Sequence, residues 1–139
     1  MLLISEDRES YLHLEGVPGD EMPTVDVVAC VDAEVVRNES VVLLGVGKFL
    51  KELEAFASSR RGGLTLCGTD EFRLCIEPDG ASGDIWISLQ VARVLYTRSP
   101  RTGRLRSGRR QLEGGFAVPG ESVTPLCRDL RRLLLREAA

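Results

Sequence analysis

Apolar and polar residues alternate along several stretches of the chain, a period of two that is typical of strands with one buried and one exposed face. The longest alternation lies in the segment TVDVVACVDAEVV, where every odd position from Val25 to Val35 is apolar. Asp26, Asp32 and Glu34 occupy three of the intervening positions. We therefore expect one long strand whose odd-numbered side chains face two helices and whose acidic residues face solvent.

Shorter alternating or apolar runs predict the other strands of the same sheet. The turn sequences Gly68-Thr69-Asp70-Glu71 and Asp79-Gly80 separate such runs. Consecutive strands that are joined by short turns must run antiparallel, so the sheet is expected to be antiparallel. The further predicted strands are residues 2–5, 11–15, 41–46, 64–67, 72–77, 85–92 and 115–118.

Two segments change to the period of an amphipathic helix. Residues 48–59 place Phe49, Leu53 and Phe56 on one stripe, and the paired glycines that follow are expected to end the helix. A second helix is predicted to start near Ser122, with Pro125 in its first turn and a stripe of leucines on one side.

This order of elements predicts an α+β fold for residues 1–139 as a single two-layer domain. We expect a mainly antiparallel, curved sheet of about seven to eight strands, with one central and one C-terminal helix on one face. Residues 99–108 read SPRTGRLRSG and show no periodic pattern. Such a segment cannot offset its ordering entropy by burial, so a mobile Arg-rich loop is predicted at residues 98–110.

The composition of the chain bears on where the protein is located and on whether it binds a metal or a cofactor. The longest apolar run has about six residues, whereas a membrane-spanning helix needs about twenty. The first residues also lack the basic start and long apolar stretch of a signal peptide, so we expect a cytoplasmic protein that does not bind membranes. The four cysteines have no CxxC spacing and His13 is the single histidine. This combination predicts buried free thiols, no metal site and no cofactor.

Neither of the common catalytic arrangements is favoured by the sequence. His13 lies in the polar set of a predicted strand, with no nucleophile motif beside it, so an ordinary surface histidine is expected. The carboxylates of the long predicted strand, with Glu15 or Glu77 beside them, are the components of a glycosidase or a cation site. Acidic residues on an exposed strand face also commonly serve solubility, and we predict that the protein is not an enzyme.

Charge and one aromatic residue indicate two candidate binding surfaces. Trp86 is the single tryptophan, and alternation places it on the polar face. There it either anchors a partner protein or is buried under the Arg-rich loop or by curvature of the sheet. Residues 1–39 contain ten acids and two arginines, a net charge of −8 from two minus ten. The first candidate surface is therefore an acidic sheet face that combines Asp26, Asp32, Glu34, Glu77 and Trp86.

The second candidate surface is basic. Residues 85–112 contain seven arginines and no acid, a composition that suits phosphate contacts. Nucleic acid is nevertheless not expected as the partner, because the whole chain carries a net charge of −3 and only Tyr96 interleaves with the arginines. A solvated loop without a partner is expected instead, or a loop that contacts an acidic protein or the acidic N-terminal segment of this chain. The arginines of this alternative patch are Arg98, Arg101, Arg104, Arg106, Arg109 and Arg110.

The order of elements resembles that of small bacterial immunity proteins of the WapI type and related actinobacterial-style domains. The resemblance lies in LLISEDRESYLHLEGV, TVDVVACVDAEVV, VVLLGVGKFLKELEAF and FRLCIEPDGASGDIWISLQV followed by FAVPGESVTPLCRDLRRLL. The Arg-rich stretch and the absence of aromatics in GVPGDEMPTV are differences from that family. The resemblance implies a non-catalytic cytoplasmic protein that neutralises a cognate toxin by binding it. The acidic sheet face favours a basic toxin domain as that partner, because toxins that attack nucleic acid tend to be basic.

Two other functions stay open from the sequence. One is an accessory or binding domain with another partner, and the other is a nucleic-acid-binding regulator that uses the Arg-rich segment. The choice between a monomer and a homodimer is also open.

Overall fold

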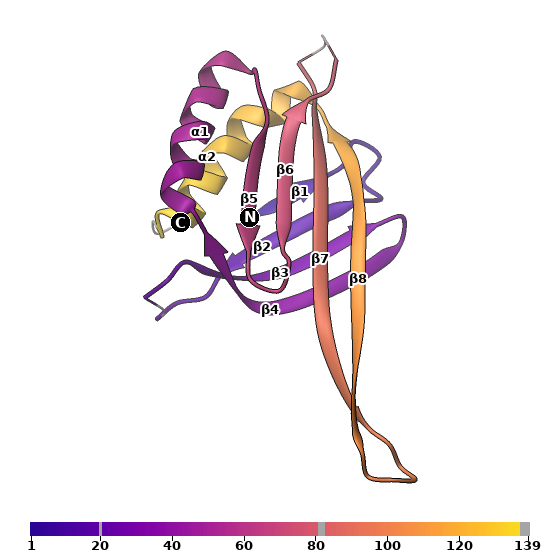
Figure 1. The fold of residues 1–139 in the computed structure, drawn as a ribbon. Helices are drawn as coiled ribbons and strands as arrows, with labels where there is room; N and C mark the ends of the chain where they lie inside the picture. Colours follow the sequence, from indigo (N-terminus) through magenta and orange to yellow (C-terminus); the bar gives the residue numbers. More distant parts are fainter. Residues whose placement is uncertain (20, 81–82, 137–139) are drawn as a thin grey trace.

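The computed structural model describes residues 1–19, 21–80 and 83–136, and within these ranges eight strands form one antiparallel sheet (Figure 1). Their order in the sheet is their order in the chain, so each strand pairs with its sequence neighbours. The elements are β1 (Leu2–Ile4), β2 (Tyr11–Gly16), β3 (Thr24–Val31), β4 (Glu34–Leu44), α1 (Val46–Ser59), β5 (Leu64–Gly68), β6 (Arg73–Pro78), β7 (Ile85–Arg98), β8 (Leu105–Val118), the 3-10 turn Gly120–Ser122 and α2 (Val123–Leu134). The predicted antiparallel sheet with a central and a C-terminal helix is confirmed.

The sheet folds back on itself between β4 and β5. Only two residue pairs, Leu43 with Gly68 and Leu44 with Cys67, join these strands. Strands β1–β4 consequently cross behind strands β5–β8 in Figure 1, and β3 and β4 contact β7 and β8 across the core. The two halves of the sheet thus cover each other's apolar faces.

Two contacts hold the halves at close range. A Cβ atom on Gly114 of β8 would lie 2.8 Å from Cγ1 of Val31, so the glycine lets β8 approach β3. The side-chain amide of Asn38 in β4 donates a hydrogen bond of 2.9 Å to the carbonyl oxygen of Ala92 in β7. The same amide nitrogen lies 3.2 Å from the Asp70 carboxylate.

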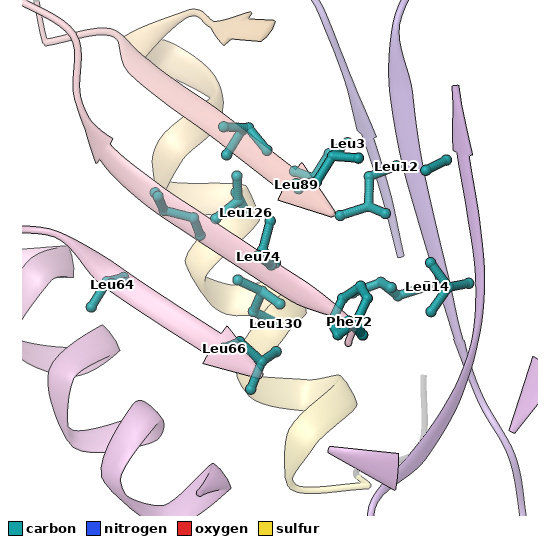
Figure 2. Packing of buried hydrophobic residues seen from close by; sticks show 14 of the residues in the cluster. Leu3, Leu12, Leu14, Leu64, Leu66, Phe72, Leu74, Leu89, Leu126 and Leu130 are labelled. Atoms are coloured by element: carbon teal, nitrogen blue, oxygen red, sulfur yellow. The ribbon is translucent and has the colours of Figure 1, made fainter. Parts of the chain in front are cut away.

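One hydrophobic core lies between the halves and the helices. Figure 2 shows Leu126 and Leu130 of α2 pointing toward Leu74 of β6. Leu3 and Leu12, from the first half of the sheet, belong to the same buried cluster. Burying one such leucine stabilises the fold by about 1.5–3 kcal/mol, so the cluster supplies the main driving force for folding.

The prediction of a single long strand from Val25 to Val35 is wrong. β3 ends at Val31, and Asp32 and Ala33 form a two-residue hairpin turn with φ values of 50° and 67°. Such positive angles match the turn type that joins twisted strands tightly. Val31 pairs with Glu34 across the turn, so the residues of β4 that follow the turn face the core at even numbers instead of odd numbers. Val35 therefore lies on the side opposite to Val31.

A bulge in β4 then returns the odd-numbered residues to the core side. The register shifts between Val25 and Val27, so Val41 of β4 is buried again. Ser40 takes a positive φ of 57° at this point, and its backbone N–H donates a 2.8 Å hydrogen bond to the Asp26 carboxylate. Asp26 therefore stabilises the bulge in β4.

The segment predicted as a loop at residues 98–110 is mostly strand. β7 and β8 pair continuously from Ile85 with Val118 to Arg98 with Leu105, and only residues 99–104 connect them. The far end of this hairpin extends away from the core and the helices in Figure 1. We call residues 93–110 the basic arm; its mobility stays a prediction.

Because Val31 and Val35 lie on opposite sides of the sheet, an aspartate should lower the free energy of unfolding by different amounts at the two positions. Val31 is only 6% exposed and faces Gly114, so Val31→Asp should place an unpaired charge in the core and unfold the protein, at a cost of at least about 3 kcal/mol. The Val35→Asp protein, whose new carboxylate lies on the other side of the sheet, should still unfold cooperatively, with a much smaller loss of unfolding free energy. Urea denaturation followed by circular dichroism measures both, and equal losses would contradict the register of β4.

The hydrogen bond between the two halves is testable at Asn38. Asn38→Ala should lower the free energy of unfolding by about 1–3 kcal/mol, because the Ala92 carbonyl loses its donor. Asn38→Asp should lower it further, since a carboxylate cannot donate and would face the Asp70 carboxylate. The same denaturation assay measures both variants. A stability equal to that of the unchanged protein for Asn38→Asp would show that this bridge does not hold the halves together.

Candidate functional site

The outer face of strands β6–β8 forms a shallow depression of about 580 Å³. Alternation along β7 sends Ile87 and Leu89 into the core and Trp86, Ser88 and Gln90 to this outer face. The depression is lined by residues of three adjacent strands, namely Arg73, Cys75, Glu77, Trp86, Ser88, Leu89, Gln90, Glu113, Gly114 and Gly115.

Gly115 positions Trp86 in this depression. A Cβ atom on Gly115 would lie 2.7 Å from Nε1 and 2.8 Å from Cε2 of the indole, so the ring lies directly over the glycine backbone. Trp86 nevertheless remains 37% exposed. The aromatic ring is thus both fixed by the sheet and open to a partner.

The rim of the depression carries charges of both signs. Arg73 pairs with Gln90 and Gln90 with Glu113, so these three side chains form one row across the strands. Glu77 is the direct cross-strand neighbour of Trp86. An aromatic residue surrounded by polar and charged groups is the usual anatomy of a protein-binding surface.

The predicted acidic face does not exist as one surface. Glu77 and Trp86 are neighbours, as expected, but Asp26 lies on the outer face of β3 in the other half of the sheet. Asp32 and Glu34 are exposed at the β3–β4 turn. Because the two halves face each other across the core, their outer faces point away from each other. The sheet bend therefore separates residues that alternation places together.

The predicted basic patch becomes a two-sided ribbon. Pairing of β7 with β8 puts Arg98 and Arg109 on the Trp86 side of the arm, and it puts Arg106 and Arg110 on the opposite side. All of these arginines are exposed. Arg109 forms an ion pair with the Glu71 carboxylate. The two remaining arginines of the patch, Arg101 and Arg104, lie in the connection between the strands.

A basic hollow at the root of the arm is a feature that sequence reasoning missed. Arg37 of β4 joins Arg93 and Arg110 of the arm around a space of about 310 Å³, which Val35 and Val36 also line. Arg93 lies in the acid-free segment 85–112, which gave a partial signal. Arg37 is distant in sequence and lies in the acidic third of the chain, so only the fold-back of the sheet brings it there.

His13 lies outside the Trp86 depression. It is half-buried on β2, where it pairs with Leu2 and Val28 and lines a shallow apolar hollow with Tyr11. Across residues 1–19, 21–80 and 83–136, no group of three or more His, Cys, Asp or Glu residues is placed to hold a metal ion. No helix in these ranges is long and apolar enough to cross a membrane.

The four cysteines are free thiols, but they are not all buried as predicted. Cys30 and Cys127 are buried, and burial raises the pKa of the Cys127 thiol. Cys67 is exposed and Cys75 is intermediate, because both lie on the outer face of the second half of the sheet. Apolar neighbours in sequence do not bury a strand residue whose side chain points outward.

Comparison of this chain with protein-family models, with curated proteins and with solved structures finds no match in any of the three.

Proposed function

We propose that this chain is a non-catalytic protein-binding domain of the immunity type, which neutralises a cognate bacterial toxin in the cytoplasm by binding it. The observation that carries the proposal is the open indole of Trp86 held over Gly115. A tryptophan that is already ordered loses little conformational entropy on binding, which is the property of an interface anchor.

The exposed part of Trp86 supplies a useful share of binding energy. Covering the remaining 37% of its surface corresponds to about 2 kcal/mol at the usual value per unit of apolar area. The shallow shape of the depression suits a side chain or loop of another protein better than an enclosed small molecule. The rim then adds hydrogen bonds and charge complementarity around this anchor.

The acidic groups beside Trp86 favour a basic partner. Glu77 is its cross-strand neighbour, and Glu113 lines the same depression. Toxins that act on nucleic acids tend to be basic, because their substrate is a polyanion. The proposed partner is therefore a basic toxin domain whose cations meet these two carboxylates, and charge attraction mainly accelerates their encounter.

Trp86→Ala should mainly accelerate dissociation from the partner. The expected increase in the dissociation rate is about 30-fold, the equivalent of the 2 kcal/mol of buried surface. Tyr96→Ala is the matched control, because Tyr96 is 68% exposed on the same side of β7 but lies on the basic arm. The partner is isolated by pull-down from the native host, and surface plasmon resonance measures the kinetics.

Charge reversal at the rim distinguishes the electrostatic attraction of the partner, which affects the association rate, from the contact with Trp86, which affects the dissociation rate. Glu77→Lys with Glu113→Lys should slow association and reduce its salt dependence. In a growth assay, the Trp86→Ala protein should no longer protect cells that produce the captured partner. Unchanged kinetics for Trp86→Ala together with lost binding for Tyr96→Ala would place the partner on the arm. A captured protein that does not harm the cell would favour an accessory binding domain.

His13→Ala should leave partner binding and protection unchanged. His13 lies on β2 among Leu2, Tyr11 and Val28, outside the Trp86 depression. The variant is assayed by the same binding kinetics and growth protection. Loss of protection by a His13→Ala protein that still folds and binds its partner would indicate catalysis and contradict the proposal.

A further inference from the structure

We propose that the basic arm, together with the hollow at its root, binds the phosphate backbone of B-form DNA. This inference is independent of the proposed protein-binding role, because it uses different residues. It rests on three observations: the distribution of arginines along the β7–β8 ribbon, the meeting of three arginines at its root, and the projection of the ribbon from the core.

Arginines cover the arm from both sides. Pairing puts Arg98 and Arg109 on one face, and Arg93, Arg106 and Arg110 on the other. A flat acidic surface, such as that of a lipid bilayer, meets a ribbon from one side only. The two walls of a DNA groove instead present phosphates to both sides of an inserted ribbon. The major groove of B-DNA is wide enough for a two-stranded β-ribbon.

The hollow at the root gathers three like charges in one place. Arg37, Arg93 and Arg110 line it, and its other lining residues, Val35 and Val36, carry no charge. Guanidinium groups repel one another when they converge, and a bound phosphate removes this repulsion. Guanidinium also matches phosphate oxygens with two parallel hydrogen bonds, which an ammonium group cannot do. The hollow of about 310 Å³ has room for one phosphate group.

The acidic character of the whole chain does not oppose this contact at physiological salt. The arm extends by about 20 Å, from about 3.3 Å per residue of strand, and charges are screened beyond about 8–10 Å. Phosphates that contact the outer part of the arm therefore meet the arginines there and little of the acidic N-terminal segment. At the root, the charged residues that line the hollow are Arg37, Arg93 and Arg110.

One internal ion pair gives the inference a test by gain of affinity. Glu71 holds Arg109 in an ion pair and thus competes with a phosphate for this guanidinium. Glu71→Gln keeps the size of the side chain and removes its charge. If the arm binds DNA, this variant should bind more tightly, by about threefold to tenfold, with a salt slope steeper by about one.

The binding assay is fluorescence anisotropy with a labelled mixed-sequence DNA duplex, titrated between about 50 and about 200 mM salt. The full chain should bind with an affinity that falls as salt rises. Arg106→Gln with Arg110→Gln should reduce the slope by about two, at about 0.9 per lost phosphate contact. Arg37→Gln with Arg93→Gln should reduce it by about one, because both arginines line the hollow for a single phosphate. Thermal unfolding checks that each variant is folded.

The control pair is Arg131→Gln with Arg132→Gln, which changes the net charge equally but lies on the exposed side of α2. This control and Trp86→Ala should bind DNA as the unchanged protein does, so failure of one proposal is distinguishable from failure of the other. Absence of salt-dependent binding overturns the inference, and so does an equal loss in the α2 control. Tighter binding to double-stranded RNA, to phosphatidylserine vesicles or to polyglutamate than to DNA also overturns it.

Discussion

The folding of the sheet back onto itself between β4 and β5 is the constraint on which the rest of this structure depends. Two helices of 14 and 12 residues cannot cover the apolar side of eight strands. The first four strands therefore cover the last four, and the reduced pairing between β4 and β5 lets the chain change direction. Gly114 admits Val31 at the closest point, and the Asn38 amide binds the backbone of β7 beside it.

The fold-back also decides which residues meet on the outer surface. The outer faces of the two halves diverge, so the acidic residues of β3 and the β3–β4 turn do not reach Trp86. The depression around Trp86 of β7 instead combines Arg73 and Glu77 of β6 with Glu113 of β8. A binding surface on a sheet depends on cross-strand neighbours, and these are set by register.

The basic arm arises from unequal strand lengths. β7 and β8 have 14 residues each, whereas β6 has six, so the second half of the hairpin has no neighbour on the β6 side. Arginines along such a ribbon protect its open edges from pairing with other chains. That ordinary role does not explain Arg37, which comes from β4 and completes the hollow at the root. The convergence of charges from two halves of the sheet is what points to a bound anion.

The sequence by itself indicated both helices and most of the strands, because period and turn residues are local properties. It also indicated that Trp86 lies on an outer face and that Glu77 lies near it. It did not reveal the turn at Asp32 and Ala33, since the alternation of apolar and polar residues continues through it. Nor did it reveal that residues 105–110 belong to a strand, because a ribbon exposed on both faces has no apolar period to detect.

Only the tertiary structure decided how the surfaces are composed. The separation of Asp26 from Glu77, the cross-core contact of Val31 with Gly114 and the meeting of Arg37 with Arg93 all depend on the fold-back between β4 and β5. The bend combines a short pairing between β4 and β5 with contacts of β3 and β4 against β7 and β8. Its consequences for residues far apart in the chain therefore cannot be read from any local pattern.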